Sequence, residues 1–517
     1  MSLPRTDLAQ GGFRQRAERI EAALRVPLLA AFGGLIAFGC LLRFLKLTDV
    51  GLWYDELWTV VGASHRPFME MYREWIVGDA HPPGYFLFYF VWLKLVPPTE
   101  FWARLPNAIA GVLTVAYLLF GTRRVLARDE RIMAALVSSL SYIYIFYALS
   151  VKQYSAMVLF ATIATIAYLQ MVSARRVDRR PAFVLTASCL ALAYLNHFAL
   201  VYAGLLLFLL AAAFQRDEPA RRRVVRMIGA FALGYLPIAY FLYIQVRYSI
   251  DAWQPYDIRG FLAELLPWFF FNDSPFVSRA LVVLLAGVIA ALVWRRDARR
   301  LLATARNGHL LIVVLAFGGF MLALGLSKPI FFARYFLVMA PAVFLGLAIL
   351  MAAAFPLRSW MAILPLIFFV HGAAVQYRSV SGLQREQWDK SVDVVLASKR
   401  PADAIYVLGA KMDKTEFDYL QAGDVDDVFM VRNLKFYRYY FRRRGADEMA
   451  AKLDVVEPTI DSARALVSRF RQTGKTVYVL AGHRSQYDSD AMAALQRGAR
   501  RIDITRLYGT LIYRLAF

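Results

Sequence analysis

Apolar residues along this chain come in long blocks that are separated by short polar segments. Many blocks reach the roughly 17–25 residues that an α-helix needs to span hydrocarbon. The pattern therefore predicts a polytopic α-helical membrane protein. The apolar blocks fall at 27–47, 84–98, 103–121, 132–149, 154–172, 182–196, 198–214, 227–246, 278–294, 309–326, 335–354 and 359–376.

The charges of the polar segments predict which side of the membrane each one occupies. Arginine gathers in four of them, which the positive-inside rule places in the cytoplasm with the basic tail 1–26. The segments 48–83 and 247–277 hold more acids than bases and are predicted to be external, as is the turn at Asn196 and His197. The arginine-rich segments are 121–131, 173–181, 215–226 and 295–308.

The predicted cytoplasmic and external segments alternate along the chain only if one apolar block does not cross the membrane. The best candidate for that block is 84–98. It is short, it follows His81-Pro82-Pro83, and it ends in Pro97-Pro98. We expect an interfacial or re-entrant helix with Tyr89 and Trp92 at headgroup depth. About eleven crossings follow, with an internal N-terminus and an external C-terminus, and twelve or thirteen are the alternative.

The part from 378 to 517 has no block long enough to span. Short apolar runs at 402–410, 475–483 and 507–517 predict buried strands, and the spacing at 462–474 predicts a helix. We therefore expect a soluble α/β domain after the transmembrane domain 27–377. Neither a G-x-G-x-x-G fingerprint nor a P-loop occurs in it, so no catalytic role is predicted for it.

Composition agrees with the block pattern. The chain is 59% hydrophobic and 19% charged, where soluble domains carry about a quarter charged residues. The formal net charge of +22 comes with arginines that lie between the apolar blocks, so it predicts cytoplasmic loops and no nucleic-acid partner. Cys40 and Cys189 both lie inside apolar blocks, which makes a disulfide framework a poor prediction.

The long external segment 48–83 holds the first candidate chemistry. Asp55 and Glu56 stand among aromatic residues in LWYDELW, and His65, Asp79 and His81 follow. A carboxylate partly desolvated at the membrane surface can act as a general base or hold a hard cation. The alternative is an acidic pair that only favours the start of a helix.

Cations on the same predicted side supply the second candidate group. Lys152 is the one charged residue in 149–157, and Lys328 and Arg334 lie in 327–341. Such cations run against the positive-inside bias and can bind a phosphate. The alternative for Lys152 is ordinary snorkelling of its side chain, and for Lys328 and Arg334 it is anchoring to lipid headgroups. A lone histidine such as His197 is more often a capping or packing residue.

The order of six motifs resembles the polytopic glycosyltransferases of the GT-C fold, in the branch with protein O-mannosyltransferases and lipid A aminoarabinose transferases. The resemblance covers roughly residues 27–345. It implies an inverting transfer of a sugar from a polyprenyl-phosphate donor to an acceptor outside the cytoplasmic membrane. The motifs are LWYDE (52–56), HPPGYF (81–86), ARLPNAIAGVLTV (103–115), LSVKQYS (149–155), NHF (196–198) and ARYFLVMAP (333–341).

The resemblance also implies roles for single residues. Asp55 would be the base or the acid that orients the acceptor, with Glu56 beside it and His81 lining the same cavity. The donor phosphate would be held by Lys152, Tyr154, Arg334 and Tyr335, and His197 matches a histidine at the corresponding turn. No nucleotide is implied. A divalent cation at Asp55 or Glu56 stays open, because relatives differ and the 149–157 turn has no carboxylate.

The implied location is a bacterial inner membrane, with the active site and the C-terminal domain facing the periplasm. The acceptor is a glycolipid, a polysaccharide or a protein of the cell envelope, and the sugar is left open. Two alternatives stand beside this reading: a transporter or flippase of a lipid-linked saccharide, and a glycan ligase or polymerase of the same fold. Transporters often show two related halves, which this sequence lacks.

Overall fold

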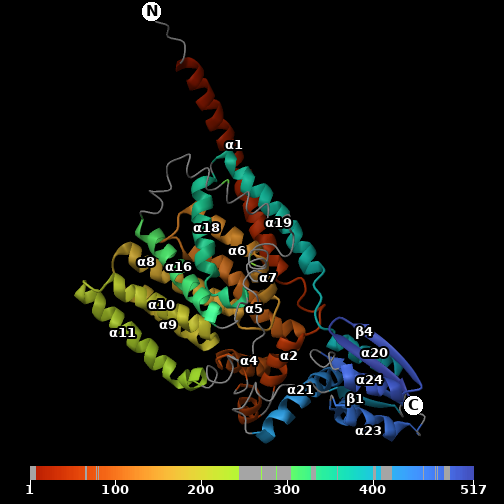
Figure 1. The fold of residues 1–517 in the computed structure, drawn as a ribbon. Helices are drawn as coiled ribbons and strands as arrows, with labels where there is room; N and C mark the ends of the chain where they lie inside the picture. Colours follow the sequence, from red (N-terminus) through yellow and green to blue (C-terminus); the bar gives the residue numbers. More distant parts are fainter. Residues whose placement is uncertain are drawn as a thin grey trace, which may run out of the picture. The chain divides into compact units, whose positions relative to one another are not determined.

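The structure is a computed structural model, and its chain groups into two compact units (Figure 1). The helical unit comprises 1–45, 105–239 and 254–382, and the mixed unit comprises 46–104, 240–253 and 383–517. The segment 46–104 thus belongs with the C-terminal part of the chain. The residues described are 7–64, 67–76, 79, 81–243, 269, 287, 304–327, 333–357, 359–399, 403–408, 422–457, 459–471, 473, 475–482 and 489–517.

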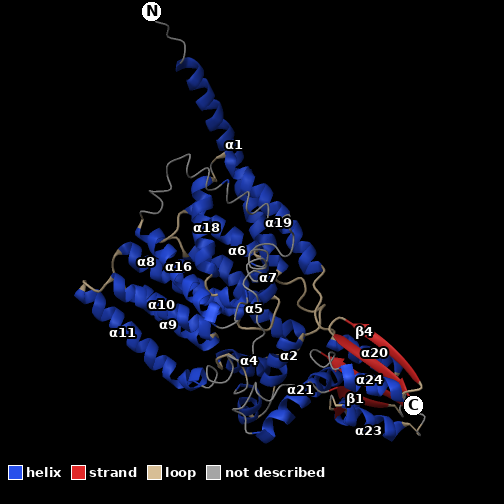
Figure 2. Cartoon of the chain, in the orientation of Figure 1, coloured by secondary structure: helices blue, strands red, loops and turns tan. Residues whose placement is uncertain are grey.

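Every element described in the helical unit is a helix, as Figure 2 shows. Most of these helices coincide with a predicted apolar block. They are α1 (Asp7–Leu42), α5 (Glu100–Ala116, whose residues 100–104 belong to the mixed unit), η2 (Tyr117–Gly121), α6 (Arg128–Leu140), α7 (Tyr142–Ala148), α8 (Tyr154–Ala174), α9 (Arg179–Leu195), α10 (His197–Ala213), α11 (Glu218–Tyr235), η3 (Leu236–Ile238), α16 (Ala305–Ser327), α17 (Ala333–Phe336), α18 (Ala340–Ala354), η5 (Trp360–Ala362) and α19 (Ile363–Ser381).

Several of these helices are long and apolar enough to cross a membrane. Among the described residues there are five such segments, at 100–121, 154–174, 218–243, 305–326 and 360–381. The bent pair α6 and α7 adds a sixth if it counts as one span. Apart from Gly287, the predicted block 278–294 lies outside the described residues. The count of eleven crossings stays a prediction.

Helices α6 and α7 meet at a 60° bend that the sequence pattern does not predict. Ending α6 there leaves its last carbonyl groups without helical partners. The fully buried guanidinium of Arg43 donates to the carbonyl oxygens of Ser139 at 2.8 Å and Ser138 at 2.9 Å. A Cβ on Gly39 would stand 2.6 Å from the Ser139 oxygen, so glycine there lets α1 lie against the end of α6. Arg43 therefore stabilises a broken helix inside the apolar bundle.

The mixed unit combines short helices from the predicted external segment with an α/β layer. Its elements are α2 (Tyr54–Ala63), α3 (Phe68–Met71), η1 (Tyr72–Ile76), α4 (Gly84–Leu95), α20 (Trp388–Ser398), β1 (Ala404–Leu408), α21 (Ala422–Arg443), α22 (Asp447–Lys452), β2 (Asp454–Val456), α23 (Ile460–Phe470), β3 (Thr476–Gly482), α24 (Ser489–Gly498), β4 (Arg501–Leu507) and β5 (Thr510–Ala516).

The sheet has the order β2-β1-β3-β5-β4. Strand β1 is parallel to β2 and β3, and β5 is antiparallel to β3 and β4. Strands β1, β3 and β5 fall in the segments predicted as strands, and α23 covers most of the predicted helix. The sequence analysis missed β2, which has three residues, and β4, which is mostly exposed at the edge.

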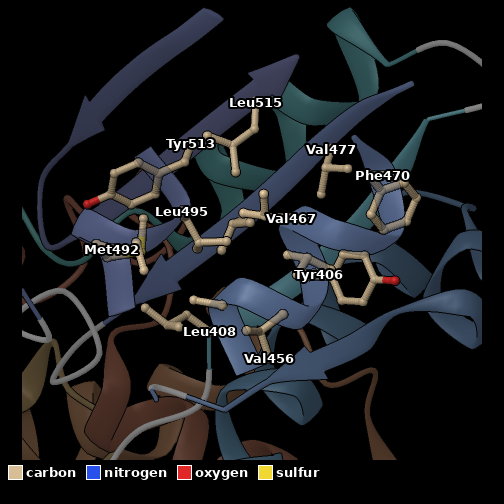
Figure 3. Close-up of a cluster of buried hydrophobic side chains, with 14 of the residues drawn as sticks. Tyr406, Leu408, Val456, Val467, Phe470, Val477, Met492, Leu495, Tyr513 and Leu515 are labelled. Atoms are coloured by element: carbon tan, nitrogen blue, oxygen red, sulfur yellow. The ribbon is translucent and has the colours of Figure 1, made fainter. Parts of the chain in front are cut away.

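Helices cover both faces of this sheet. On one face, Val467 and Phe470 of α23 and Leu495 of α24 pack against strand residues such as Tyr406 and Leu515 (Figure 3). On the other, the fully buried indole of Trp388 in α20 lies against Gly482, where a Cβ would meet the ring at 2.3 Å. Rings of α21 pack on the same indole, so α20 and α21 are tied to the sheet by one aromatic cluster.

Helix α4 has the dimensions of an interfacial helix. Its 12 residues span roughly 18 Å, well short of the roughly 30 Å hydrocarbon core. Phe88, Val91 and Leu95 form an exposed apolar stripe along it. Tyr89 is fully buried within the protein, and its hydroxyl donates to the carbonyl oxygen of Ala103 at 2.6 Å. Its position at headgroup depth stays a prediction.

Candidate active site

The candidate acids lie in the first turn of α2. Trp53 precedes the helix in an extended conformation, and its backbone N–H donates to Oε2 of Glu56 at 3.2 Å. A carboxylate in this position satisfies a backbone donor that the helix leaves without a partner, and it complements the helix dipole. This much matches the reading in which the pair favours a helix start.

Glu56 is fully buried and is engaged by two arginines. Nε of Arg104 donates to Oε1 at 2.9 Å and Nη2 donates to Oε2 at 2.6 Å. Nη1 of Arg385 forms an ion pair with Oε2 at 2.9 Å. A bidentate guanidinium–carboxylate pair is among the strongest side-chain interactions, and it keeps both oxygens occupied. We therefore interpret Glu56 as a positioning residue, and not as the group that takes a proton or holds a cation.

Arg104 uses all five of its N–H donors. Beyond the two bonds to Glu56, it donates to the carbonyl oxygens of Leu47 at 3.1 Å, Val50 at 2.6 Å and Gly51 at 2.9 Å. One side chain thus fixes the loop that enters α2 and the first turn of α2 itself. Arg104 lies within the ARLPNAIAGVLTV motif, which by itself assigns it no role. The sequence does not distinguish a buried arginine from an exposed one, because its hydrogen-bond acceptors lie elsewhere along the chain.

Residues of the C-terminal part hold the same stretch from another side. Oε2 of Glu386 accepts from the backbone N–H of Tyr54 at 2.8 Å and from the indole of Trp388 at 2.9 Å. The hydroxyl of Tyr440 accepts from the backbone N–H of Leu52 at 2.7 Å. Burial raises the pKa of Tyr440 well above its ordinary value, which keeps the phenol neutral. No catalytic role was predicted for this part of the chain, and its contacts show that it positions the acidic helix.

Asp55 differs from its neighbour in exposure. Its side chain is half-buried, whereas Glu56 is inaccessible. The aromatic residues around it hold α2 in place: Trp58 contacts Trp75 with ring centroids 4.7 Å apart, and Tyr54 contacts Phe436 at 5.4 Å. Of the two acids, Asp55 is the one that an acceptor hydroxyl can approach.

His81 is oriented by a carboxylate. Oδ1 of the buried Asp79 lies 2.8 Å from the backbone nitrogen of His81 and 2.7 Å from its ring Nδ1. A carboxylate on one ring nitrogen fixes the tautomer and the direction of an imidazole, as it does in many catalytic sites. The sequence analysis named Asp79 without assigning this pairing. His65 lies outside the described residues.

Lys152 is the most informative cation of the helical unit. It lies in the turn between α7 and α8, a turn held by Asn107, whose amide donates to the carbonyl oxygen of Ser150 at 2.7 Å. The Lys152 side chain is 7% exposed, and no described residue forms an ion pair or hydrogen bond with it. It also stands beside the N-terminus of the 21-residue helix α8. A buried ammonium at a helix N-terminus is stabilised when an anion binds there.

The other predicted phosphate ligands lie near two turns of the same unit. Tyr154 is buried and packs on Tyr147 with ring centroids 4.3 Å apart. The ring of Tyr335 contacts Phe198 at 4.7 Å, and the guanidinium carbon of Arg334 lies 5.6 Å from the centroid of the Tyr335 ring.

The structure thus brings the segment 334–335 to the turn that holds His197. That histidine is the first residue of α10, and Asn196 caps the helix by accepting from the Phe198 N–H at 2.8 Å. Lys328 lies outside the described residues.

The candidate residues therefore form two groups. Asp55, Glu56 and His81 belong to the mixed unit. The cations and tyrosines predicted to hold phosphate, with His197, belong to the helical unit. In the described ranges no cluster of three or more His, Cys, Asp or Glu side chains could hold a metal ion.

Replacing Arg385 with alanine should lower the stability of the mixed unit. It removes one of two guanidinium partners from the buried Glu56, together with a contact to the Trp53 ring at 5.7 Å. A loss of roughly 1.5–3 kcal/mol is expected for a buried charge-assisted contact. Thermal unfolding of the purified protein in detergent measures it.

The matched control is Arg444→Ala, because Arg444 pairs with Asp393 at the surface at 2.7 Å. Exposed pairs contribute about 0–1 kcal/mol. Equal Tm changes in the two variants would contradict the structural role of Arg385.

Comparisons with known proteins agree with the predicted resemblance. Residues 80–243 match the family described as dolichyl-phosphate-mannose-protein mannosyltransferase. ArnT from Cupriavidus metallidurans, in the apo state, is similar with a TM-score of 0.54 and 13% identity, over 94% of this chain and 98% of that chain. The same protein bound to undecaprenyl phosphate gives 0.54 and 12%, over 93% and 97%. No curated protein sequence matches.

These findings confirm the resemblance to polytopic glycosyltransferases and the fold predicted with it. The likeness to ArnT covers 94% of this chain and 98% of that chain. The family match begins just before His81 and takes in Arg104, Lys152 and His197.

Proposed function

We propose that this chain transfers a sugar from a polyprenyl-phosphate donor to an acceptor of the cell envelope, with inversion at the anomeric carbon. The observation that carries the proposal is Lys152, a buried ammonium at the N-terminus of α8 for which the described residues offer no partner. It lies inside the segment that matches a family named for a lipid-phosphate-linked sugar. The likeness to ArnT, solved with undecaprenyl phosphate, supports the same class of donor.

In the proposed reaction, an acceptor oxygen attacks the anomeric carbon and forms the new glycosidic bond. The bond between that carbon and the phosphate oxygen breaks, and polyprenyl phosphate leaves with the electron pair. Asp55 accepts the proton of the attacking group. Lys152 and Arg334 stabilise the charge that develops on the leaving phosphate, an effect that a surrounding of low dielectric strengthens. His81, fixed by Asp79, contacts the acceptor.

The proposed reaction also requires that Asp55 and the predicted phosphate ligands act on the same donor molecule. We place this site at the face of the membrane opposite the arginine-rich segments, in keeping with the positive-inside rule. For a bacterial inner membrane this face is the periplasmic one.

The test supplies a polyprenyl-phosphate sugar, labelled in the sugar, to the purified protein in lipid nanodiscs with candidate envelope acceptors. The proposal expects label on the acceptor and release of polyprenyl phosphate in equal amounts. In sealed vesicles, movement of the intact labelled lipid without cleavage would instead support a transporter. If a preassembled lipid-linked glycan is supplied as a second donor, its transfer without single-sugar transfer would support a ligase.

Lys152→Ala should weaken donor use. Losing a charge-assisted contact to phosphate is expected to raise the donor KM by roughly 10- to 100-fold. Steady-state kinetics at varied donor concentration measure this change, and Lys152→Arg should retain part of the affinity. The control is Lys94→Ala, since Lys94 of α4 is exposed and lies over the ring of Phe90. A donor KM equal to wild type in Lys152→Ala would remove this residue from the phosphate site.

A further inference from the structure

The helical unit has a cavity that the proposed reaction does not use. Its volume is about 400 Å³, within the range of small-ligand pockets. It lies at the end of the unit where η2, the last turns of α8 and the first turn of α9 meet. Its lining includes Tyr117, Phe120, Arg123, Arg124, Gln170 and Arg180. It thus belongs to the arginine-rich segments 121–131 and 173–181.

The three arginines of the cavity form no ion pair with a described carboxylate. No ion pair or hydrogen bond involves Arg123, Arg124 or Arg180. All three arginines are solvent-exposed, and together they give the mouth of the cavity a positive charge that attracts an anion.

Acids of the same segments are engaged elsewhere. Glu130 pairs with Arg306 at 2.7 Å, and Asp178 pairs with Arg176 at 2.9 Å. Asp129 accepts from the backbone N–H of Leu357 at 3.0 Å. None of these carboxylates is among the residues that line the cavity. The cavity therefore keeps its positive charge although acids stand close by in sequence.

The backbone beside the cavity has an unusual conformation. The segment η2 is a π-helical turn. Such turns are rare in proteins, and those that occur are often found at functional sites. A Cβ on Gly121 would stand 2.4 Å from the ring of Tyr117, so only glycine lets that ring lie over the turn. The hydroxyl of Tyr117 and the side-chain amide of Gln170 add neutral hydrogen-bonding groups to the three arginines.

Apolar surface at the same end points to lipid as the source of the anion. Phe120 is 64% exposed and lies in the cavity lining, and Phe183 in α9 is 74% exposed. A basic cavity between apolar helices with exposed aromatic residues is the arrangement that binds anionic headgroups. We propose that this cavity binds the phosphate headgroup of an anionic membrane lipid, in the leaflet that contacts the arginine-rich segments.

The test measures lipid binding by native mass spectrometry of the delipidated full-length protein, with phosphatidylglycerol and phosphatidylcholine as probes. Wild type should bind phosphatidylglycerol at least about tenfold more tightly than phosphatidylcholine, and the triple variant R123Q/R124Q/R180Q should lose that preference. The control R216Q/R222Q/R226Q removes the same charge from equally exposed positions that do not line the cavity. It should bind both lipids as wild type does.

Three results would overturn the proposal. One is equal binding of the two lipids by wild type, and another is an equal loss in both triple variants, which would mean a general effect of charge. The third is full displacement of phosphatidylglycerol by millimolar inorganic phosphate, which would make free phosphate the ligand. Unchanged Tm values in the variants confirm that the lost binding is local, and the single variant R180Q serves if the triple variant fails to fold. None of these readouts depends on glycosyl transfer.

Discussion

Asp55→Asn should lower turnover by about 10²–10⁴-fold, the contribution typical of a positioned general base. The amide keeps the size of the side chain and the place in the first turn of α2, and it cannot accept the acceptor's proton. Donor binding should stay as in wild type, because the predicted phosphate ligands, Lys152 and Arg334, are unchanged. The measurement is kcat with labelled donor, together with donor affinity of the same preparation.

The control for this variant is Asp49→Asn. Asp49 is an acid of the same unit whose side chain is 55% exposed and pairs with Lys46. It should retain turnover and Tm. Turnover close to wild type in Asp55→Asn would show that another group takes the proton, and His81 with its Asp79 partner would then be the first candidate.

Arg104→Ala should destabilise the mixed unit more than any other single change considered. It leaves the buried Glu56 with one guanidinium partner and removes the donor to three backbone carbonyl groups. Removing one partner of a buried pair costs about 3–5 kcal/mol. Thermal unfolding and the yield of folded protein measure the effect. A Tm near wild type would contradict the network described for Arg104.

Glu56→Gln separates the roles of the two acids. It keeps the shape and loses the charge that both arginines pair with, so we expect lower Tm and lower turnover together. Asp55→Asn should lower turnover alone. If Glu56→Gln were as stable as wild type and inactive, Glu56 would be the reacting acid and the positioning role would be wrong.

The contrast between Asp55 and Glu56 shows what the sequence could not provide. The two residues are adjacent and chemically alike, and the sequence analysis treated both as catalytic. What separates them is a pair of arginines far along the chain, Arg104 and Arg385, which reach only one of the two carboxylates. No local pattern predicts such a pairing, because an arginine beside an apolar run looks like any loop cation.

Elements with strong local patterns were predictable. The apolar runs of β1 and β3 are buried on both faces, and they read as strands from composition alone. Strand β4 lies at the sheet edge and is mostly exposed, so its sequence lacks the apolar run that predicts a buried strand. The bend after α6 has no proline or glycine to mark it, since it depends on contacts with α1 through Arg43.

The most direct test of the central claim is a photo-crosslink. A polyprenyl-phosphate sugar that carries a diazirine beside the anomeric carbon would be irradiated with the full-length protein, and the adducts would be mapped by mass spectrometry. The account predicts adducts in both 52–58 and 149–155, each suppressed by unlabelled polyprenyl phosphate. Adducts confined to one of these segments, or insensitive to the competitor, would contradict a single site that combines Asp55 with Lys152.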